Sequence, residues 1–310
     1  MKWLKEFDNE ISQVFVEAQA IISQFPPPLE HKGLSYLNKF NIHSEDSTKN
    51  YICYLLPFWM KETSTLPNED YRKLSLGNVF AMLYFFIQDD LMDEPSNNDR
   101  SQLILSNLFY LHFLDIYRSY FASDSLFWIY FNQYIREWSV GLTNENHKDY
   151  FQSDPSMIAK KSAPLKLSST GILLLSGQND LIPIVSDLVE RVLITLQMAD
   201  DWIDWHEDLA DGNYNSLLSM IKKEHYPNQI LTVDTVKTSI YVRSIMKNYV
   251  DIATANHQYL LSLDIQLTHL LSFHEMLVND LSQDAQEIEE SRISQQQGGL
   301  HYWLLENTRK

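Results

Sequence analysis

The sequence predicts an all-α fold, and three observations support this prediction. Apolar residues recur at helical spacing over long stretches, only 8 Gly and 10 Pro interrupt the 310 residues, and no stretch alternates between apolar and polar residues for long enough to indicate a sheet. Hydrophobic residues make up 45% of the chain, which is enough to bury a large core. Because neither an internal repeat nor a flexible linker divides the chain, we expect residues 1–310 to form a single domain.

Clusters of Pro, Gly and Asn separate the expected helices. The helices fall near residues 4–24, 47–61, 69–93, 100–121, 125–141, 156–176, 182–208, 214–224, 234–262 and 265–292. The segments that break them lie at residues 26–28, 67–68, 95–99, 143–155, 177–183, 212–213 and 227–228. We expect Asp70 and Asp234 to be N-caps, because an Asp side chain at a helix start accepts hydrogen bonds from the first backbone N–H groups.

The charge balance of the chain limits its partners. It has 24 Lys and Arg against 41 Asp and Glu, a net charge of −17, which argues against nucleic acid and anionic membranes. The first ten residues lack the apolar run of a secretory signal, and no apolar stretch is long enough to span a membrane. We therefore expect a cytoplasmic protein without stable membrane insertion. A chain this acidic needs a divalent metal or a similar cation to bind an anionic substrate.

Two clusters of Asp stand at the ends of apolar helical stretches. The first reads DDLMD at residues 89–93, and the second reads DDWID at residues 200–204 and continues to Asp208. Asp89 and Asp93 are four residues apart, and Asp200, Asp204 and Asp208 recur every four residues. Each set therefore shares one face of its helix.

Both clusters break the same two rules of helix stability. Like charges at this spacing destabilise a helix by about 0.2–0.5 kcal/mol per pair, and carboxylates near a helix C-terminus oppose its dipole by about 0.3–1 kcal/mol each. Such conflicts are typical of functional sites. Magnesium would resolve them, because it prefers carboxylate and phosphate oxygens. The alternative, a solvated acidic face, suits a lone Asp pair better than two copies of DDxxD.

The pair of motifs resembles that of the class I isoprenoid (terpene) synthase superfamily. In that family a single helical bundle surrounds a central cavity, and two helices present acidic motifs that hold magnesium ions against a diphosphate. The stretch from Gln197 to Asp204 is similar to the QxxDDxxD of prenyltransferases, and DLADG at residues 208–212 resembles their DLxxG. The resemblance covers roughly residues 85–215. It implies three magnesium ions in the substrate complex and a set of metal ligands comprising Asp89, Asp90, Asp93, Asp200, Asp204 and Asp208.

The resemblance also implies how the diphosphate is bound. Lys160-Lys161-Ser162 resembles the Lys-Thr pair that contacts diphosphate in prenyltransferases. Lys161 is the expected hydrogen-bond donor to the diphosphate oxygens, with Lys160 or Arg191 as alternatives.

Three further residues are candidates for the cavity that encloses the allylic cation. Phe85 and Phe86 lie one turn before Asp89, where their rings could stabilise the cation by cation–π attraction. Gln197 lies one turn before Asp200 and could point a polar group into the same space. The alternatives are core packing for the two Phe residues and a buried, hydrogen-bonded amide for Gln197.

The motifs leave two enzyme classes open. The second motif is prenyltransferase-like, yet it also fits the terpene-cyclase pattern NDxxSxxxE, with Asp200, Asp204 and Asp208 at the ligand positions. Chain-elongating prenyltransferases carry a basic GKRxR-type segment before the first motif and an Arg pair after it, and both are missing here. This difference favours a terpene synthase, a lyase that acts on one prenyl diphosphate and cyclises or quenches the cation. A trans-prenyltransferase, either chain-elongating or using a non-diphosphate acceptor, is the alternative.

The substrate and assembly are less closely defined by the sequence. The bulky Tyr84 and Phe85 favour a substrate of fifteen or twenty carbons over longer chains. Members of the family often pair, so a homodimer is compatible with the resemblance. A non-catalytic subunit should have lost carboxylates from one motif, whereas both motifs are intact here. A di-iron bundle requires Glu-x-x-His pairs, which this sequence lacks.

Overall fold

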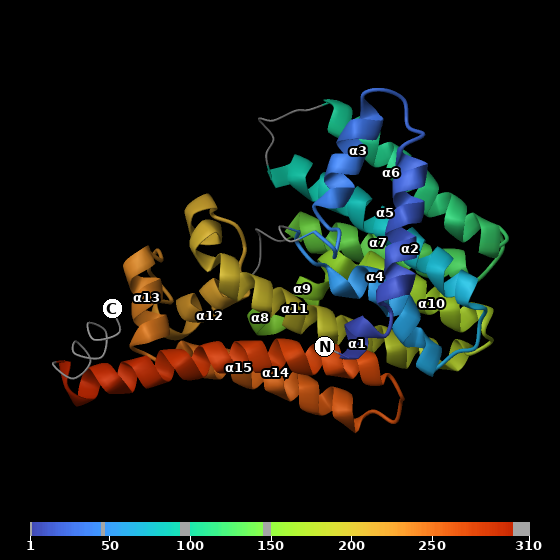
Figure 1. Ribbon diagram of the computed structural model, residues 1–310. Coiled ribbons are helices and arrows are strands. Elements are labelled where there is room, and N and C mark those ends of the chain that lie inside the picture. Colours follow the sequence, from blue (N-terminus) through green and yellow to red (C-terminus); the bar gives the residue numbers. More distant parts are fainter. Residues whose placement is uncertain (1, 45–46, 94–99, 145–149, 300–310) are drawn as a thin grey trace. The chain divides into compact units, whose positions relative to one another are not determined.

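The computed structural model describes residues 2–44, 47–93, 100–144 and 150–299. Within these residues the ordered elements are all helices, which confirms the predicted all-α fold (Figure 1). In the same parts of the chain, each helix is either too short or too polar to cross a lipid bilayer.

The helices belong to two compact units. Unit 1 comprises Met1–Arg136, Ala163–Asp187 and Ile265–Leu270, and unit 2 comprises Glu137–Ser162, Leu188–Asp264 and Leu271–Lys310. Three helices begin in unit 1 and end in unit 2, namely α7 (Phe127–Asn144), α11 (Ile182–Asp211) and α15 (Thr268–Gln297). The expectation of a single domain stays a prediction.

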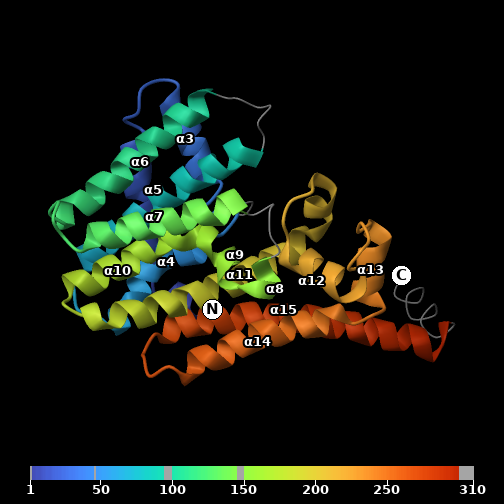
Figure 2. The ribbon, with the colours of Figure 1, turned by 180° about the vertical axis from the view of Figure 1, so that it is seen from behind.

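Unit 1 is built around the long helix α5, which packs against α2, α4 and α6 (Figures 1 and 2). Its helical elements are α1 (Lys2–Lys5), α2 (Asp8–Ile22), α3 (Leu29–Asn38), α4 (Tyr51–Trp59), η1 (Met60–Glu62), α5 (Asn68–Asp93), α6 (Arg100–Tyr120), α10 (Lys166–Leu175) and η3 (Asn179–Leu181). The helix α10 packs against α4 and α5. The core of unit 1 thus lies between helices that are far apart in the sequence.

Aromatic rings fill much of this core. Phe127 stacks on Phe121 with their ring centroids 4.2 Å apart, and it stacks on Tyr117 at 4.7 Å. Tyr117 is also in edge contact with Phe113, at 5.3 Å. Stacked and edge-on rings contribute about 0.5–1.5 kcal/mol per pair beyond the burial of their area. These contacts hold α6 against the start of α7.

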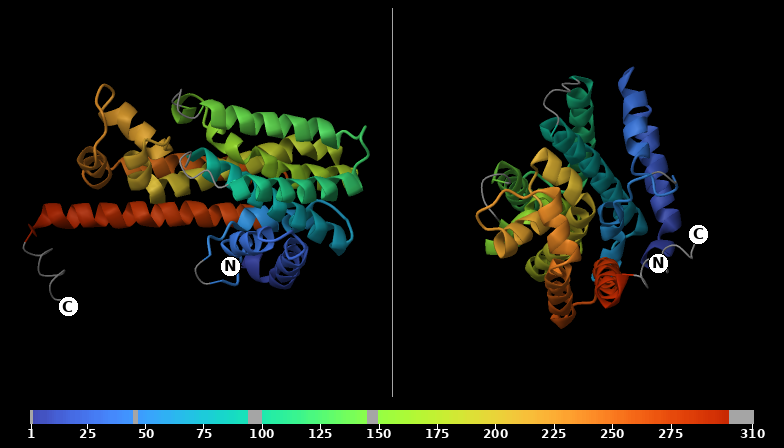
Figure 3. Two further views of the ribbon diagram at one scale, coloured as in Figure 1. Left: turned by 90° about the horizontal axis from the view of Figure 1, so that it is seen from above. Right: turned by 90° about the vertical axis from the view of Figure 1, so that its left-hand side faces the viewer.

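Unit 2 contains shorter helices and one long helical hairpin. Its helices are α8 (Tyr150–Ser153), α9 (Ser156–Ala159), α12 (Ser216–His225), α13 (Val233–Tyr241) and α14 (Ile245–Ser262), together with the start of η2 (Lys160–Leu165) and the unit-2 parts of α7, α11 and α15. The helices α14 and α15 lie side by side (Figure 3). A hydrogen bond of 2.9 Å joins His257 to His274 across this hairpin. Trp202 donates to Asp284 over 2.7 Å and so links α11 to α15.

Several expected helices are divided or shifted in the structure. The stretch 4–24 forms α1 and α2, and the stretch 156–176 forms α9, η2 and α10, with Pro164 inside the 3₁₀ segment. The stretch 234–262 forms α13 and α14, because Ser244 adopts left-handed backbone angles (φ 56°) between them. The helix α3, formed by a short polar segment after three consecutive Pro residues, was not predicted.

Both predicted N-caps were wrong. Asp70 lies inside the first turn of α5, where its carboxylate accepts a hydrogen bond from Tyr120 at 2.7 Å. Asp234 lies in the first turn of α13, whose N-cap is Thr232. Thr232 and Thr235 form a reciprocal capping box, in which each side chain bonds the backbone N–H of the other. In both helices the Asp lies in the first turn, where its negative charge is stabilised by the positive end of the helix dipole, but another residue caps the helix or begins it.

The capping box predicts the effect of Thr232→Ala. This change should lower the free energy of unfolding by about 1 kcal/mol, because it removes the acceptor for a backbone N–H of the first turn. Urea denaturation followed by circular dichroism measures the difference. Thr238→Ala, in the middle of the same helix, is the matched control and should be close to neutral, since Ala has the highest helix propensity. Equal losses in both variants would contradict the capping role.

Candidate functional site

The second acidic motif lies on the C-terminal half of α11, within unit 2. Asp200 and Asp204 are exposed, Asp208 is half-buried, and Asp201 is buried with 4% of its surface exposed. Exposure therefore follows helical geometry: the residues at four-residue spacing reach the surface, while the adjacent Asp201 points into the protein. The regular spacing of one helix thus places three carboxylates toward the surface and leaves Asp201 among hydrogen-bond donors.

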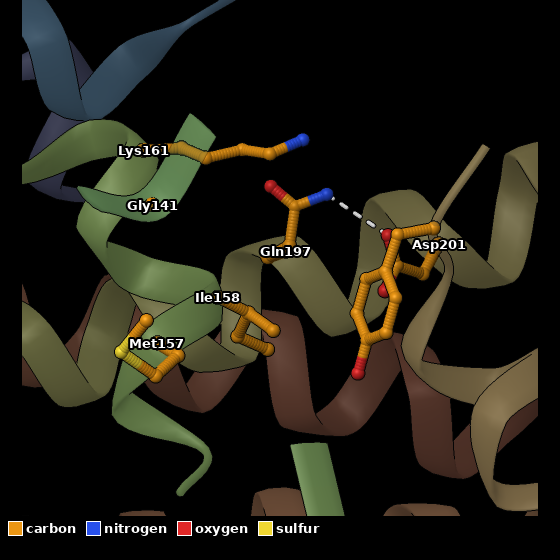
Figure 4. A pocket seen from close by; sticks show the side chains of 7 residues that line it. Gly141, Met157, Ile158, Lys161, Gln197 and Asp201 are labelled. Carbon is orange, nitrogen blue, oxygen red and sulfur yellow. Dashed lines mark hydrogen bonds between the residues drawn. The ribbon is translucent and has the colours of Figure 1, made fainter. Parts of the chain in front are cut away.

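Hydrogen bonds surround the buried Asp201 carboxylate. The backbone N–H of Ser216 donates to its Oδ2 over 2.7 Å, and the Ser216 hydroxyl donates to the same oxygen. Gln197 Nε2 donates to Oδ1 over 2.9 Å (Figure 4). Burial raises the pKa of Asp201, and the hydrogen bonds from Ser216 and Gln197 oppose that rise. A buried carboxylate needs such partners, since desolvation without them is costly.

Asn215 connects the acidic motif to the start of α12. Its Oδ1 accepts from the Leu218 N–H at 3.0 Å, so Asn215 is the N-cap of that helix. Its Nδ2 donates to the Asp201 carbonyl oxygen over 2.7 Å and to Asp208 Oδ2 over 2.8 Å. One buried amide therefore contacts both the backbone and a carboxylate of the motif.

The carboxylates on the exposed face of the motif repel one another. The pKa of Asp200 is raised to about 6, first by burial of its carboxyl group and then by Asp204, Asp201 and Asp208, while Lys161 lowers it. The residue as a whole is exposed, so solvent reaches part of the side chain although the carboxyl group is flanked by protein. Burial and the Asp208 charge also raise the pKa of Asp204. The cluster therefore favours any cation that reduces this repulsion.

A small pocket opens beside the motif in unit 2. The residues that line it are Gly141, Met157, Ile158, Lys161, Gln197, Asp201 and Tyr214. Lys161 and Gln197 extend into the same space from η2 and α11 (Figure 4). The pocket thus combines a cation, an amide and Asp201, the buried carboxylate of the acidic motif.

Gly141 permits the close packing that places Lys161. A Cβ at this position of α7 would lie 3.0 Å from the Lys161 backbone nitrogen and 3.2 Å from the Lys160 carbonyl carbon. Backbone atoms cannot move aside as a flexible side chain can, so a larger residue would displace the segment that carries Lys161.

The structure distinguishes among the three predicted diphosphate-binding cations. Lys161 lies in the pocket, whereas Lys160 Nζ contacts the Met157 sulfur at 2.8 Å. Arg191 stacks on the Tyr259 ring, with Cζ 4.0 Å from its centroid, and donates to Asn256 Oδ1 over 3.4 Å.

The side chain of Arg191 also points away from the acidic face of α11. About two and a half helical turns separate Arg191 from Asp200, so their side chains leave opposite sides of α11. Lys161 is therefore the predicted cation that the structure brings to the second motif.

The first acidic motif ends α5, within unit 1. Asp89 is half-buried, Asp90 is exposed, and the side chain of Asp93 lies outside the described residues. Tyr36, from α3, donates a hydrogen bond to Asp90 Oδ2 over 2.9 Å. Burial and the charges of Asp90 and Asp89 raise the pKa of Tyr36 well above its usual value, so it is a donor at neutral pH.

The two candidate aromatic residues before this motif are half-buried. Phe85 is in contact with Tyr84, with ring centroids 4.9 Å apart, and with Phe113 at 6.5 Å. Phe86 packs on Phe40, with centroids 5.1 Å apart. Both rings belong to aromatic clusters of unit 1, and their role in a substrate cavity stays a prediction.

The donor set of the second motif fits a magnesium ion that is held together with a substrate. In the described parts of the chain, no three His, Cys, Asp or Glu side chains are grouped so that they could hold a metal ion by themselves. Magnesium in phosphate-transfer sites is usually bound by one or two carboxylates, with water and phosphate oxygens as its other ligands. Asp200, Asp204 and Asp208 can supply such carboxylates. The predicted role of these three residues and of Asp89, Asp90 and Asp93 as metal ligands stays a prediction.

Comparison with known proteins adds no family assignment. No protein-family model matches the chain, and no curated protein matches it. The resemblance to class I isoprenoid synthases therefore rests on the motifs and their spacing.

Sequence reasoning missed the residues that support the second motif. Asn215 and Ser216 hold Asp201 and Asp208, Tyr214 lines the pocket, and Tyr36 holds Asp90. A signal for Asn215 was present, because Asn followed by a helical stretch is a frequent N-cap. Its second bond, to a carboxylate seven residues earlier, depends on the turn between the two helices and has no local signal.

The charge cluster predicts a pH-dependent effect of Asp200→Asn. Because the folded protein binds this proton with a pKa of about 6 and the unfolded chain with a pKa of about 3.9, the folded state loses stability as the pH rises between these values. Asp200→Asn should therefore be more stable than the wild type at pH 7.5 in metal-free buffer, by about 1 kcal/mol or less because solvent screens the exposed group.

Urea unfolding at pH 7.5 and at pH 4.5 measures this difference, which should shrink at the lower pH. Asp211→Asn, at the exposed end of the same helix, is the matched control for removing one negative charge. A stability gain that is the same at both pH values would contradict the repulsion.

Proposed function

We propose that this protein is a magnesium-dependent class I terpene synthase of the cytoplasm. It ionises a linear allylic prenyl diphosphate of fifteen or twenty carbons, releases diphosphate, and cyclises or quenches the cation. The observation that carries the proposal is the pocket of unit 2, where Lys161 and Gln197 lie beside the acidic motif of α11. A cation next to carboxylates with raised pKa values suits an anionic ligand that arrives with divalent metal ions.

The residues of unit 2 have distinct parts in the proposed ionisation. Asp200, Asp204 and Asp208 hold the metal ions, which supply Lewis-acid stabilisation of the leaving diphosphate when bound. Lys161 donates hydrogen bonds to the diphosphate oxygens and stabilises the charge that develops on them as the carbon–oxygen bond breaks. Gln197 is fixed by its bond to Asp201, so its amide is held at the pocket without reorganisation.

The first motif and the two Phe residues complete the proposal. Asp89, Asp90 and Asp93 supply further metal ligands, as the resemblance implies. The pocket of unit 2 is small, so it receives the diphosphate end of the substrate. For Phe85 and Phe86 of unit 1 we propose the role expected from the sequence, in which aromatic faces stabilise the allylic cation by about 2 kcal/mol.

Prenyl transfer to a non-diphosphate acceptor is the second candidate function. The observation that favours it is the QxxDDxxD pattern with Gln197 at its first position, which is similar to prenyltransferases. In this case the ionisation of the prenyl diphosphate is unchanged. The allylic cation is then captured by a separate acceptor molecule and not by the substrate's own double bonds.

Product analysis tests the proposed reaction. Purified protein incubated with magnesium and either farnesyl or geranylgeranyl diphosphate alone should release diphosphate and form a hydrocarbon or terpene alcohol, detected by mass spectrometry. Removal of magnesium with EDTA should abolish both products. Diphosphate release that absolutely requires an added acceptor would support prenyl transfer instead, and no reaction with any allylic diphosphate would contradict both functions.

Substitution of one carboxylate in each motif tests the assignment of metal ligands. Asp204→Ala and Asp89→Ala should each lower turnover by about a thousandfold, because several kcal/mol of charge stabilisation are lost. Helix content, measured by circular dichroism, should not change. Asp211→Ala, at a variable position of the DLADG segment, and Asp115→Ala on α6 remove exposed carboxylates that are not assigned as metal ligands, and both serve as controls. Full turnover of Asp204→Ala or Asp89→Ala would contradict the assignment.

A further inference from the structure

Every hydrogen-bonding group of the Asn215 side chain has a partner, either in the second motif or at the start of α12. It is buried, with 2% of its surface exposed. Its two N–H groups have two acceptors, the Asp201 carbonyl oxygen and Asp208 Oδ2, and its oxygen accepts from the Leu218 N–H. The orientation of the amide follows from these partners, because the helix N–H needs an acceptor and the carboxylate needs a donor.

This combination of partners explains why Asn stands at the cap of α12. Ser, Thr and Asp can also cap a helix, so capping alone does not require an amide. An Asp at position 215 would accept from Leu218 equally well, but it would bring a second negative charge beside Asp208. Asn accepts from the helix start and donates to two oxygens at once.

The bond to Asp208 orients that carboxylate without saturating it. A carboxylate has two oxygens and about four acceptor positions, and Asn215 contacts only Oδ2. Asp208 occupies the third position of the series that begins with Asp200 and Asp204, near the C-terminal end of α11. A rotation about its side-chain bonds would turn it away from that face, and the amide of Asn215 opposes such a rotation.

We propose that Asn215 is a positioning residue that presents Asp208 to the metal ions of the site. The inference rests on the proposed function, because it assumes that Asp208 is a metal ligand. Ser216 has a similar part for Asp201, the neighbour of Asp200, which it holds through its backbone N–H and its hydroxyl. Residues that orient metal ligands in this way typically contribute 10- to 100-fold to metal affinity.

The variant that tests this inference is Asn215→Asp. Asp keeps an acceptor that caps α12, but it cannot donate to Asp208 and repels it, so its fold is checked by circular dichroism before binding is measured. The measurement is the binding of Mn²⁺ in the presence of inorganic pyrophosphate, followed by the electron paramagnetic resonance signal of free Mn²⁺. Protein-free solutions with the same Mn²⁺ and pyrophosphate serve as the blank, because pyrophosphate alone also binds Mn²⁺. We expect the apparent Kd for Mn²⁺ to rise about 10- to 100-fold at a temperature where circular dichroism shows the same helix content as in the wild type.

Three further variants separate positioning from other causes. Thr232→Asp introduces the same charge at the N-cap of another helix of unit 2, and its Mn²⁺ affinity should equal that of the wild type. Asn215→Ser keeps a neutral cap with a single short donor, and it should bind Mn²⁺ with intermediate affinity. If Asn215 acts through Asp208, then Asp208→Asn combined with Asn215→Asp should weaken Mn²⁺ binding no more than Asp208→Asn alone.

The outcomes distinguish this inference from the proposed function. If wild-type protein binds Mn²⁺ with pyrophosphate while Asn215→Asp and Asn215→Ser bind it equally well, Asn215 is a helix cap only and the inference is wrong. Additive effects in the double variant would also overturn it. If the wild-type protein itself does not bind Mn²⁺ with pyrophosphate, the proposed function fails, and the inference fails with it.

Discussion

The buried carboxylate of Asp201 is the group around which the described site is organised. It lies inside unit 2 with 4% exposure, so it must be surrounded by donors. Those donors come from its own helix, through Gln197, and from the start of α12, through Ser216. Tyr249 of α14 is hydrogen-bonded to the Ser216 hydroxyl at 2.6 Å. One internal charge thus connects three helices and sets the turn that brings Asn215 to Asp208.

The exposed carboxylates of the same helix act against stability. Asp200, Asp204 and Asp208 repel one another, and they stand near the negative end of the helix dipole. Lys161 offsets part of this repulsion from a different segment of unit 2. Chains retain such unfavourable groupings where a ligand removes the conflict. The buried network of Asp201 and Asn215 keeps the repelling groups in place, because it anchors the helix end that carries them.

Sequence patterns predicted the long helices well and the short or broken ones poorly. The strongly periodic stretches around α5, α6, α11 and α15 lie within a few residues of their expected ends. The division at Ser244 was not predicted, because a left-handed backbone at a residue other than Gly has no clear local signature. The helix α3 is short and polar, and it is stabilised by tertiary contacts: a Cβ at Gly33 would meet Ile22 of α2 and Leu105 of α6. Propensity alone cannot reveal such a helix.

The sequence by itself determined the helical class and the spacing of the acidic residues, since both follow from a period of 3.6 residues that is local to each helix. It also nominated Lys161 as the diphosphate-binding cation, with Lys160 and Arg191 as alternatives. Only the tertiary structure placed Lys161 in the pocket, directed Arg191 toward Tyr259, and provided Asn215 and Ser216 as partners of the carboxylates. These choices depend on turns and on contacts between helices distant in the chain. Hydrogen-bond geometry across such contacts leaves no periodic trace in the sequence.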